Sequence, residues 1–133
     1  MKKVLSLIFV FALVGVVGAA DVDDLTKKAN SGDAQAMYDL GMAYMNGDGI
    51  DNDDAKGVSW LEKAAYKGHS EAQYELGLAI FNGYGVTADR VKGCSWLYTT
   101  EVDAAAYNCT QLEPDQRTKA LDEAAKIQKN IKK

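Results

Sequence analysis

Apolar positions along most of the chain recur at helical spacing, and residues that start or end helices stand between them. In the first such stretch, small or apolar residues spaced four, three and four positions apart share one helix face: Ala36, Leu40, Ala43 and Gly47. Asp33 is suited to cap the start of this helix, and glycines at 47 and 49 are suited to end it. The pattern therefore predicts a helix from about Asp33 to Asn46.

The same signals predict further helices to the end of the chain. Asp53 and Asp89 are suited to cap helices, and Pro114 suits the first turn of a last helix that ends near Ile131. On this last helix we expect an apolar face made of Leu121, Ala124, Ala125 and Ile127. The predicted helices cover 21–30, 33–46, 53–67, 69–82 or 70–82, a stretch from 89 onward, 103–110 and 114–131.

The chain also repeats itself with a period of 36 residues. Residues 27–62 align without a gap on residues 63–98, and seventeen of the 36 positions are identical. A fixed period of this length indicates stacked helical units, each of which buries its apolar face on the next. We expect the repeated Gly41 and Gly77 to let two helices approach closely. The aromatic residues that recur at this period are expected in the core: Tyr38, Tyr74, Trp60 and Trp96.

The first twenty residues have the layout of a secretory signal peptide. Two lysines precede an apolar run over residues 4–17, and small residues follow this run. The run is shorter than the ~20 residues that a membrane-spanning helix needs. We predict cleavage after Ala19 or Ala20, a periplasmic or secreted location, and no stable membrane insertion of the mature chain.

The charge of the chain argues against one class of partner. Cleavage would remove two of the 15 basic residues and none of the 19 acidic residues, so the net charge would change from −4 to −6. A negatively charged surface disfavours nucleic acids and anionic membranes as partners. The remaining length is that of a single domain.

The two units share a longer motif. The first unit carries Leu-Gly at 40–41, Gly-Asp-Gly-Ile at 47–50 and Trp60, and the second carries Leu-Gly at 76–77, Gly-Tyr-Gly-Val at 83–86 and Trp96. This motif, over about residues 33–100, resembles the Sel-one-like repeat, a branch of the tetratricopeptide-like α-solenoids. The resemblance implies an all-α fold, a short α-α superhelix (solenoid) of two 36-residue helix-turn-helix repeats with helical caps. We divide the chain into a signal peptide (1–20), an N-terminal cap helix (21–32), repeat one (33–68), repeat two (69–100), and a degenerate third unit with a C-terminal capping helix (101–133).

The resemblance also implies a function. It points to an exported, non-enzymatic protein–protein interaction module that acts as an envelope adaptor or regulator, with another protein or peptide as its partner. One alternative is a periplasmic immunity protein that binds and inhibits a toxic effector enzyme, its acidic charge covering a basic site. A second alternative, from another class, is a cell-wall or β-lactam hydrolase.

Polar residues with potential chemistry have simpler structural explanations. The acidic loop over 48–54 fails the ligand pattern of a helix–loop–helix calcium site, because an alkyl side chain falls at its fifth position. His69, the sole histidine, aligns with the cap of the preceding unit, and we expect it at the surface. Ser59 and Ser95 recur without a base evident beside them. We therefore predict no catalytic, cofactor-binding or metal-ligating residues and no cofactor.

The two cysteines suggest a disulfide. Cys94 and Cys109 fall on neighbouring predicted helices, and cysteine pairs in exported proteins usually bridge. We predict a Cys94–Cys109 disulfide, with two half-buried thiols as the alternative.

Three tyrosines are candidates for partner binding. A ligand-facing surface should vary between copies of a repeat while the scaffold recurs, and tyrosine supplies contact area with a polar tip. Tyr44, Tyr84 and Tyr98 do not recur in kind. We predict that they contribute to a partner-binding surface.

Overall fold

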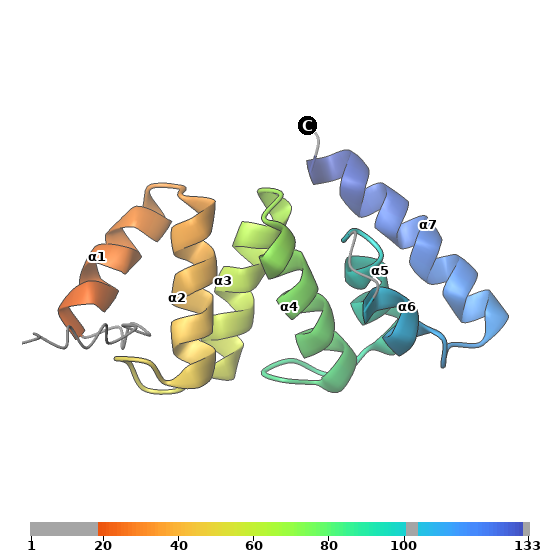
Figure 1. The fold of residues 1–133 in the computed structure, drawn as a ribbon, viewed down its shortest axis with the longest axis horizontal. Coiled ribbons are helices and arrows are strands. Elements are labelled where there is room, and N and C mark those ends of the chain that lie inside the picture. The colour runs from red at the N-terminus through yellow and green to blue at the C-terminus, as the bar shows by residue number, and fades with distance from the viewer. Residues whose placement is uncertain (1–18, 101–103, 132–133) are drawn as a thin grey trace, which may run out of the picture.

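The computed structural model describes the backbone of residues 19–100 and 104–131, and within these ranges every regular element is an α-helix (Figure 1). Residues 1–18 of the predicted signal peptide (1–20) lie outside the described residues. Each helix predicted from the sequence is present, with ends within two residues of the predicted ones. The helices are α1 Ala19–Asn30, α2 Ala34–Asn46, α3 Asp54–Tyr66, α4 Ser70–Asn82, α5 Arg90–Leu97, α6 Ala104–Cys109 and α7 Pro114–Ile131.

The helices stack in a row that follows chain order (Figure 1). Helices α2 and α3 pack as one antiparallel pair, α4 and α5 pack as a second, and α3 packs on α4 to join the pairs. At the two ends of the row, α1 packs on α2 and α7 packs on α5. The fold is therefore an all-α solenoid of two helical hairpins, with a further helix closing each end.

Side-chain caps start the helices of both hairpins. Three aspartates each accept a hydrogen bond of 2.9–3.0 Å from the backbone N–H three residues further on: Asp33, Asp53 and Asp89. The fourth cap is His69, whose Nδ1 accepts a 3.2 Å bond from the backbone N–H of Ala72. Each cap satisfies a backbone donor that has no partner within the helix, which fixes where these helices begin.

Glycines let the two helices of each hairpin touch backbone to backbone. A Cβ atom at Gly41 would lie 3.0 Å from the carbonyl oxygen of Gly57. A Cβ atom at Gly93 would lie 2.7 Å from the backbone nitrogen of Phe81 and 2.8 Å from the carbonyl oxygen of Gly77. The expected role of Gly41 and Gly77 is confirmed, and Gly57 and Gly93 are their partners across each hairpin.

The recurring aromatic residues are buried to different degrees. Trp96 is only 1% exposed, and the ring of Tyr66 meets it edge to face at a centroid distance of 4.9 Å. Its counterpart Trp60 is half-buried, with the ammonium group of Lys63 4.0 Å from its ring centre. Tyr38 and Tyr74 are also half-buried. The expectation that all four lie in the core is therefore right in full only for Trp96.

The buried face of α7 differs from the predicted one at two positions. Ala120 and Ala124 are buried, and Ile127 and Ile131 pack partly against the core. These residues are spaced four, three and four positions apart, which defines a single stripe along the helix. Leu121 is 49% exposed and Ala125 is also exposed, so their predicted places on the apolar face are wrong.

Candidate partner-binding groove

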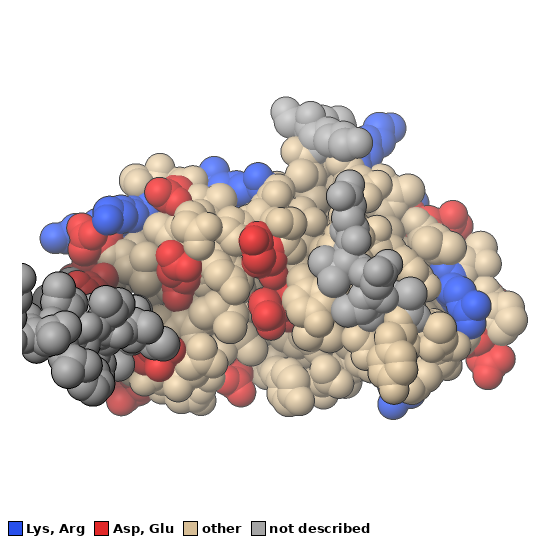
Figure 2. All heavy atoms as spheres, in the orientation of Figure 1, with Lys and Arg blue, Asp and Glu red and all other residues tan. Residues whose placement is uncertain are grey.

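A pocket of about 560 Å³ opens across α2, α4 and the turn that follows α5. We call it the central pocket. Figure 2 shows acidic side chains over α2 and α4 on this face, with the visible basic side chains toward its edges. The residues that line the pocket are Tyr38, Gly68, Ser70, Glu71, Gln73, Tyr74, Glu75, Thr99 and Thr100.

The wall formed by Tyr38 is held in place by His69. The two rings stack with their centroids 4.8 Å apart and their planes 18° from parallel. Because Nδ1 of His69 accepts the cap bond, Nε2 carries the proton of the neutral ring and donates to Oε1 of Gln35 at 3.0 Å. The side chain of His69 is only 11% exposed, which differs from the surface position expected for it. The histidine links the two repeats and orients the pocket wall.

The floor of the pocket contains a buried polar contact. Gln73 is 6% exposed; its amide donates to the carbonyl oxygen of Ala65 at 3.2 Å and accepts from the hydroxyl of Thr99 at 3.2 Å. The first repeat has Met37 at the equivalent position, so this contact is particular to the second repeat. It ties α4 to the turn after α5, and that turn forms one side of the pocket.

A second pocket of about 400 Å³ continues from the first. The two share Gly68, Gln73, Thr99 and Thr100, and the second extends to Tyr98, Gln128 and Ile131 at the end of α7. We call the two pockets together the central groove. The groove is acidic and aromatic over α2 and α4, and neutral where it reaches α7.

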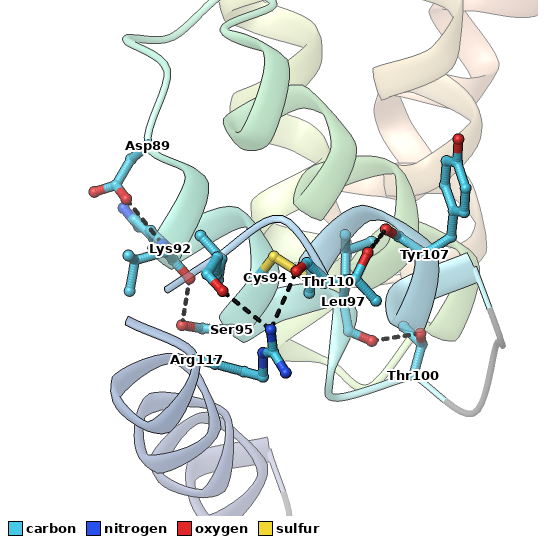
Figure 3. The surroundings of a disulfide bond; sticks show 12 residues. Asp89, Lys92, Cys94, Ser95, Leu97, Thr100, Tyr107, Thr110 and Arg117 are labelled. Carbon is cyan, nitrogen blue, oxygen red and sulfur yellow. Dashed lines mark hydrogen bonds between the residues drawn. A yellow bond between two sulfur atoms is a disulfide. The ribbon is translucent and has the colours of Figure 1, made fainter. Parts of the chain in front are cut away.

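A disulfide links α5, the helix before the turn at the groove, to α6. Cys94 of α5 is bonded to Cys109 of α6, and both residues are fully buried; Figure 3 shows the surroundings of this bond. Beside them, the guanidinium group of Arg117 on α7 donates to the carbonyl oxygens of Thr110 at 3.1 Å and Leu112 at 3.0 Å. These bonds hold α5, α6 and α7 together, and the predicted cysteine bridge is present in the structure.

Carboxylates dominate the electrostatics of the groove. Burial raises the pKa of Glu75 above that of a glutamate in water. Burial is also the main cause of a raised pKa at Tyr38, and the carboxylates of Glu75, Glu71 and Asp39 raise it further. For Glu71, hydrogen bonds from its own backbone N–H and from the hydroxyl of Ser70 lower the pKa. Of these carboxylates, Glu71 and Glu75 line the central pocket, and both come from α4.

The three tyrosines predicted to bind a partner do not lie together. Tyr98 lines the second pocket of the groove. Tyr44, in the last turn of α2, packs against the core and lies under the ammonium group of Lys56 at 5.6 Å. Tyr84 is 55% exposed in the turn after α4. Helices α2 and α4 end at the opposite end of the hairpins from the end of α5 (Figure 1), so Tyr44 and Tyr84 are remote from Tyr98.

The other polar residues considered from the sequence have structural partners. Ser95 is fully buried, and its hydroxyl donates to the carbonyl oxygen of Val91 at 2.9 Å and to Oε2 of Glu123 at 3.1 Å. In the described part of the chain, no group of three or more histidine, cysteine, aspartate or glutamate side chains is placed to hold a metal ion. Nor does any helix there have the length and apolar content of a membrane span.

Comparison with known proteins agrees with the fold. The Sel1 repeat family model matches residues 34–69 and 70–99. The chain contains two Sel1 repeats. No curated protein matches it in sequence.

Two solved structures are similar to these Sel1 repeats. One is a protective antigen present in uropathogenic Escherichia coli strains that displays an SLR fold, with a TM-score of 0.80 and 26% identity over 85% of this chain. The match covers 26% of that antigen, so the present chain spans about a quarter of its length. The other is a Sel1 repeat protein from Oxalobacter formigenes, with 27% identity over 77% of this chain and 98% of that one, at a TM-score of 0.33.

Proposed function

We propose that the chain is an exported, non-enzymatic protein-binding module that acts as an adaptor or regulator in the bacterial envelope. Sel1 repeats generally mediate binding to other proteins. The disulfide is compatible with an exported protein, because such bonds persist in oxidising compartments. The layout of the first twenty residues supports the same location.

The observation that carries this proposal is the central groove. It crosses both repeats and reaches α7, and its aromatic walls and polar floor are held by bonds within the fold. A concave surface with apolar rings and a few fixed polar groups suits recognition of a segment of another protein. In this function the groove holds a segment of the partner, and the two hairpins act as a rigid support.

Inhibition of a toxic effector enzyme is a second candidate function. The specific observation that favours it is the acidic groove, whose carboxylates would oppose a basic site on such an enzyme. By contrast, no observation in the described residues favours a hydrolase. Ser95 is buried and forms hydrogen bonds to α5 and α7, and His69 caps α4 and stacks on Tyr38.

Crosslinking in the native envelope tests the proposed function. The tagged chain is purified after crosslinking, the mature N-terminus is determined by mass spectrometry, and the proteins that accompany it are identified and purified. Direct binding of a set of envelope components supports the adaptor role. One dominant enzyme that the chain inhibits supports the immunity role. Recovery of the uncleaved chain from the cytoplasm, or no direct binding by any crosslinked protein, contradicts the proposal.

A further inference from the structure

The central pocket is lined by two carboxylates and by no lysine or arginine side chain. The two carboxylates belong to Glu71 and Glu75. Among the described residues, Glu75 forms no ion pair. Glu71, whose side chain is 67% exposed, accepts a hydrogen bond from the hydroxyl of Ser70 at 3.0 Å, and its Oε2 lies 3.5 Å from Nδ1 of His69. Since Nδ1 of His69 accepts the cap bond from Ala72, this atom has no proton to donate to Glu71.

The position of Glu75 makes this charge costly. The side chain is half-buried beside Tyr38 and Tyr74, and burial raises its pKa. A carboxylate withdrawn from water is stabilised by a nearby cation or by hydrogen-bond donors, and without them it weakens folding. A cation that enters from outside would offset this cost and would gain a charge-assisted hydrogen bond.

The aromatic walls favour the same type of guest. Tyr38 is fixed by its stack on His69, and Tyr74 lines the pocket next to Glu75. Lysine and arginine side chains bind well over aromatic rings. The fold already uses such contacts elsewhere: Lys63 lies 4.0 Å from the ring centre of Trp60 and Arg90 lies 5.6 Å from that of Phe81.

The shape of the groove indicates what kind of molecule carries the bound cation. The pocket of about 560 Å³ falls within the ~300–1,000 Å³ typical of ligand sites. It opens into the neutral second pocket beside Ile131 and Gln128. A cation attached to a chain that continues along this second pocket would use both parts, whereas a free small amine would use only the first.

We propose that the central groove recognises its partner through a lysine or arginine side chain of a protein segment, received between the carboxylates of Glu71 and Glu75 and the rings of Tyr38 and Tyr74. Uncharged residues of the same segment lie in the second pocket toward Ile131. The proposal rests on the proposed function, in which the groove holds a segment of another protein.

Binding of defined peptide mixtures tests the proposal. Four fluorescein-labelled heptapeptide mixtures share random uncharged flanks and differ only in the central residue, which is lysine, arginine, glutamine or glutamate. Affinities are measured by fluorescence anisotropy with the mature, disulfide-bonded chain, and the contacted residues are located by NMR shifts of the backbone amides. The variant Glu71→Gln with Glu75→Gln is compared with a matched control, Asp51→Asn with Glu62→Gln, which removes equal charge at exposed positions.

The expected result is binding of the lysine and arginine mixtures, with shifts at Tyr38 and Glu75 and no binding of the glutamate mixture. The groove variant should lose about tenfold or more in affinity, the size of one charge-assisted hydrogen bond, and the control should lose little. Circular dichroism verifies that both variants fold.

Four results would overturn the proposal, and they point to different causes. Equal binding of the glutamine and lysine mixtures in the groove would reject the cation while leaving the proposed function in place. Equal losses in the two variants would show a general effect of net charge. Equally tight binding of 1,4-diaminobutane would reject a protein segment as the occupant. Binding of no mixture would reject it too, and the groove would then also fail as the partner site.

Discussion

The contact between α4 and α5 at Gly93 gives the sharpest stability prediction. A Cβ atom at this position would lie 2.7 Å from the backbone nitrogen of Phe81, and ordinary contacts begin at 3.4 Å, so Gly93→Ala forces the helices apart by about 0.7 Å. Overpacking of this kind costs ~1–3 kcal/mol, and we expect the upper end because backbone atoms cannot rotate away. Alanine regains about 1 kcal/mol in helix propensity. The net loss in free energy of unfolding is therefore about 2 kcal/mol, or roughly 8 °C in Tm for a chain of this length.

Urea and thermal unfolding, followed by circular dichroism on the disulfide-bonded mature chain, measure this loss. The control is Ala125→Gly at an exposed position of α7, where only helix propensity changes and the expected loss is about 1 kcal/mol. A Gly93→Ala variant as stable as the parent chain would refute the argument, because propensity alone makes alanine the better residue in a helix.

Three further predictions concern the disulfide, the histidine cap and the half-buried glutamate Glu75. Replacing both Cys94 and Cys109 by alanine should lower the free energy of unfolding by about 3 kcal/mol, since the bridge closes a loop of 15 residues; equal urea midpoints for the variant and the oxidised parent would contradict this. His69→Ala should lower the free energy of unfolding by roughly 1.5–2.5 kcal/mol, because both the cap and the ring stack are lost. His69→Asp should restore only the part due to the cap. Equal free energies of unfolding for the two variants would show that the cap contributes nothing. Because burial raises the pKa of Glu75, this side chain loses its proton in the unfolded chain at a lower pH than in the folded chain, so a rise in pH weakens folding. Glu75→Gln removes this loss, so the Tm of the variant relative to the parent should be higher at about pH 7 than at about pH 4. A Tm difference that does not change with pH would be inconsistent with the half-buried carboxylate.

The helices were predictable because their signals are local. Asp33, Asp53 and Asp89 cap helices at the positions expected, and the 36-residue period predicted the two hairpins. The face of α7 was less predictable. Leu121 and Ile127 are both apolar, and only packing against α5 decides which of them is buried.

The groove was harder to predict because it joins residues that are distant in the sequence. Tyr38 and Tyr74 recur at the period, which indicated core positions, yet both are half-buried and line a pocket. One signal was present in the alignment of the two repeats: Gln73 stands where the first repeat has Met37, a polar residue at a buried position. Its partner Thr99 comes from the turn after α5, and no local pattern relates these two residues.

The central claim is that the groove across α2 and α4 contacts the partner. Site-specific photo-crosslinking in the native envelope tests it most directly, with p-benzoylphenylalanine in place of Tyr74 in the groove or in place of Glu62 on the exposed face of α3. We expect crosslinked partner proteins from position 74 and none from position 62. A partner crosslinked from position 62, with none from position 74, would contradict the claim.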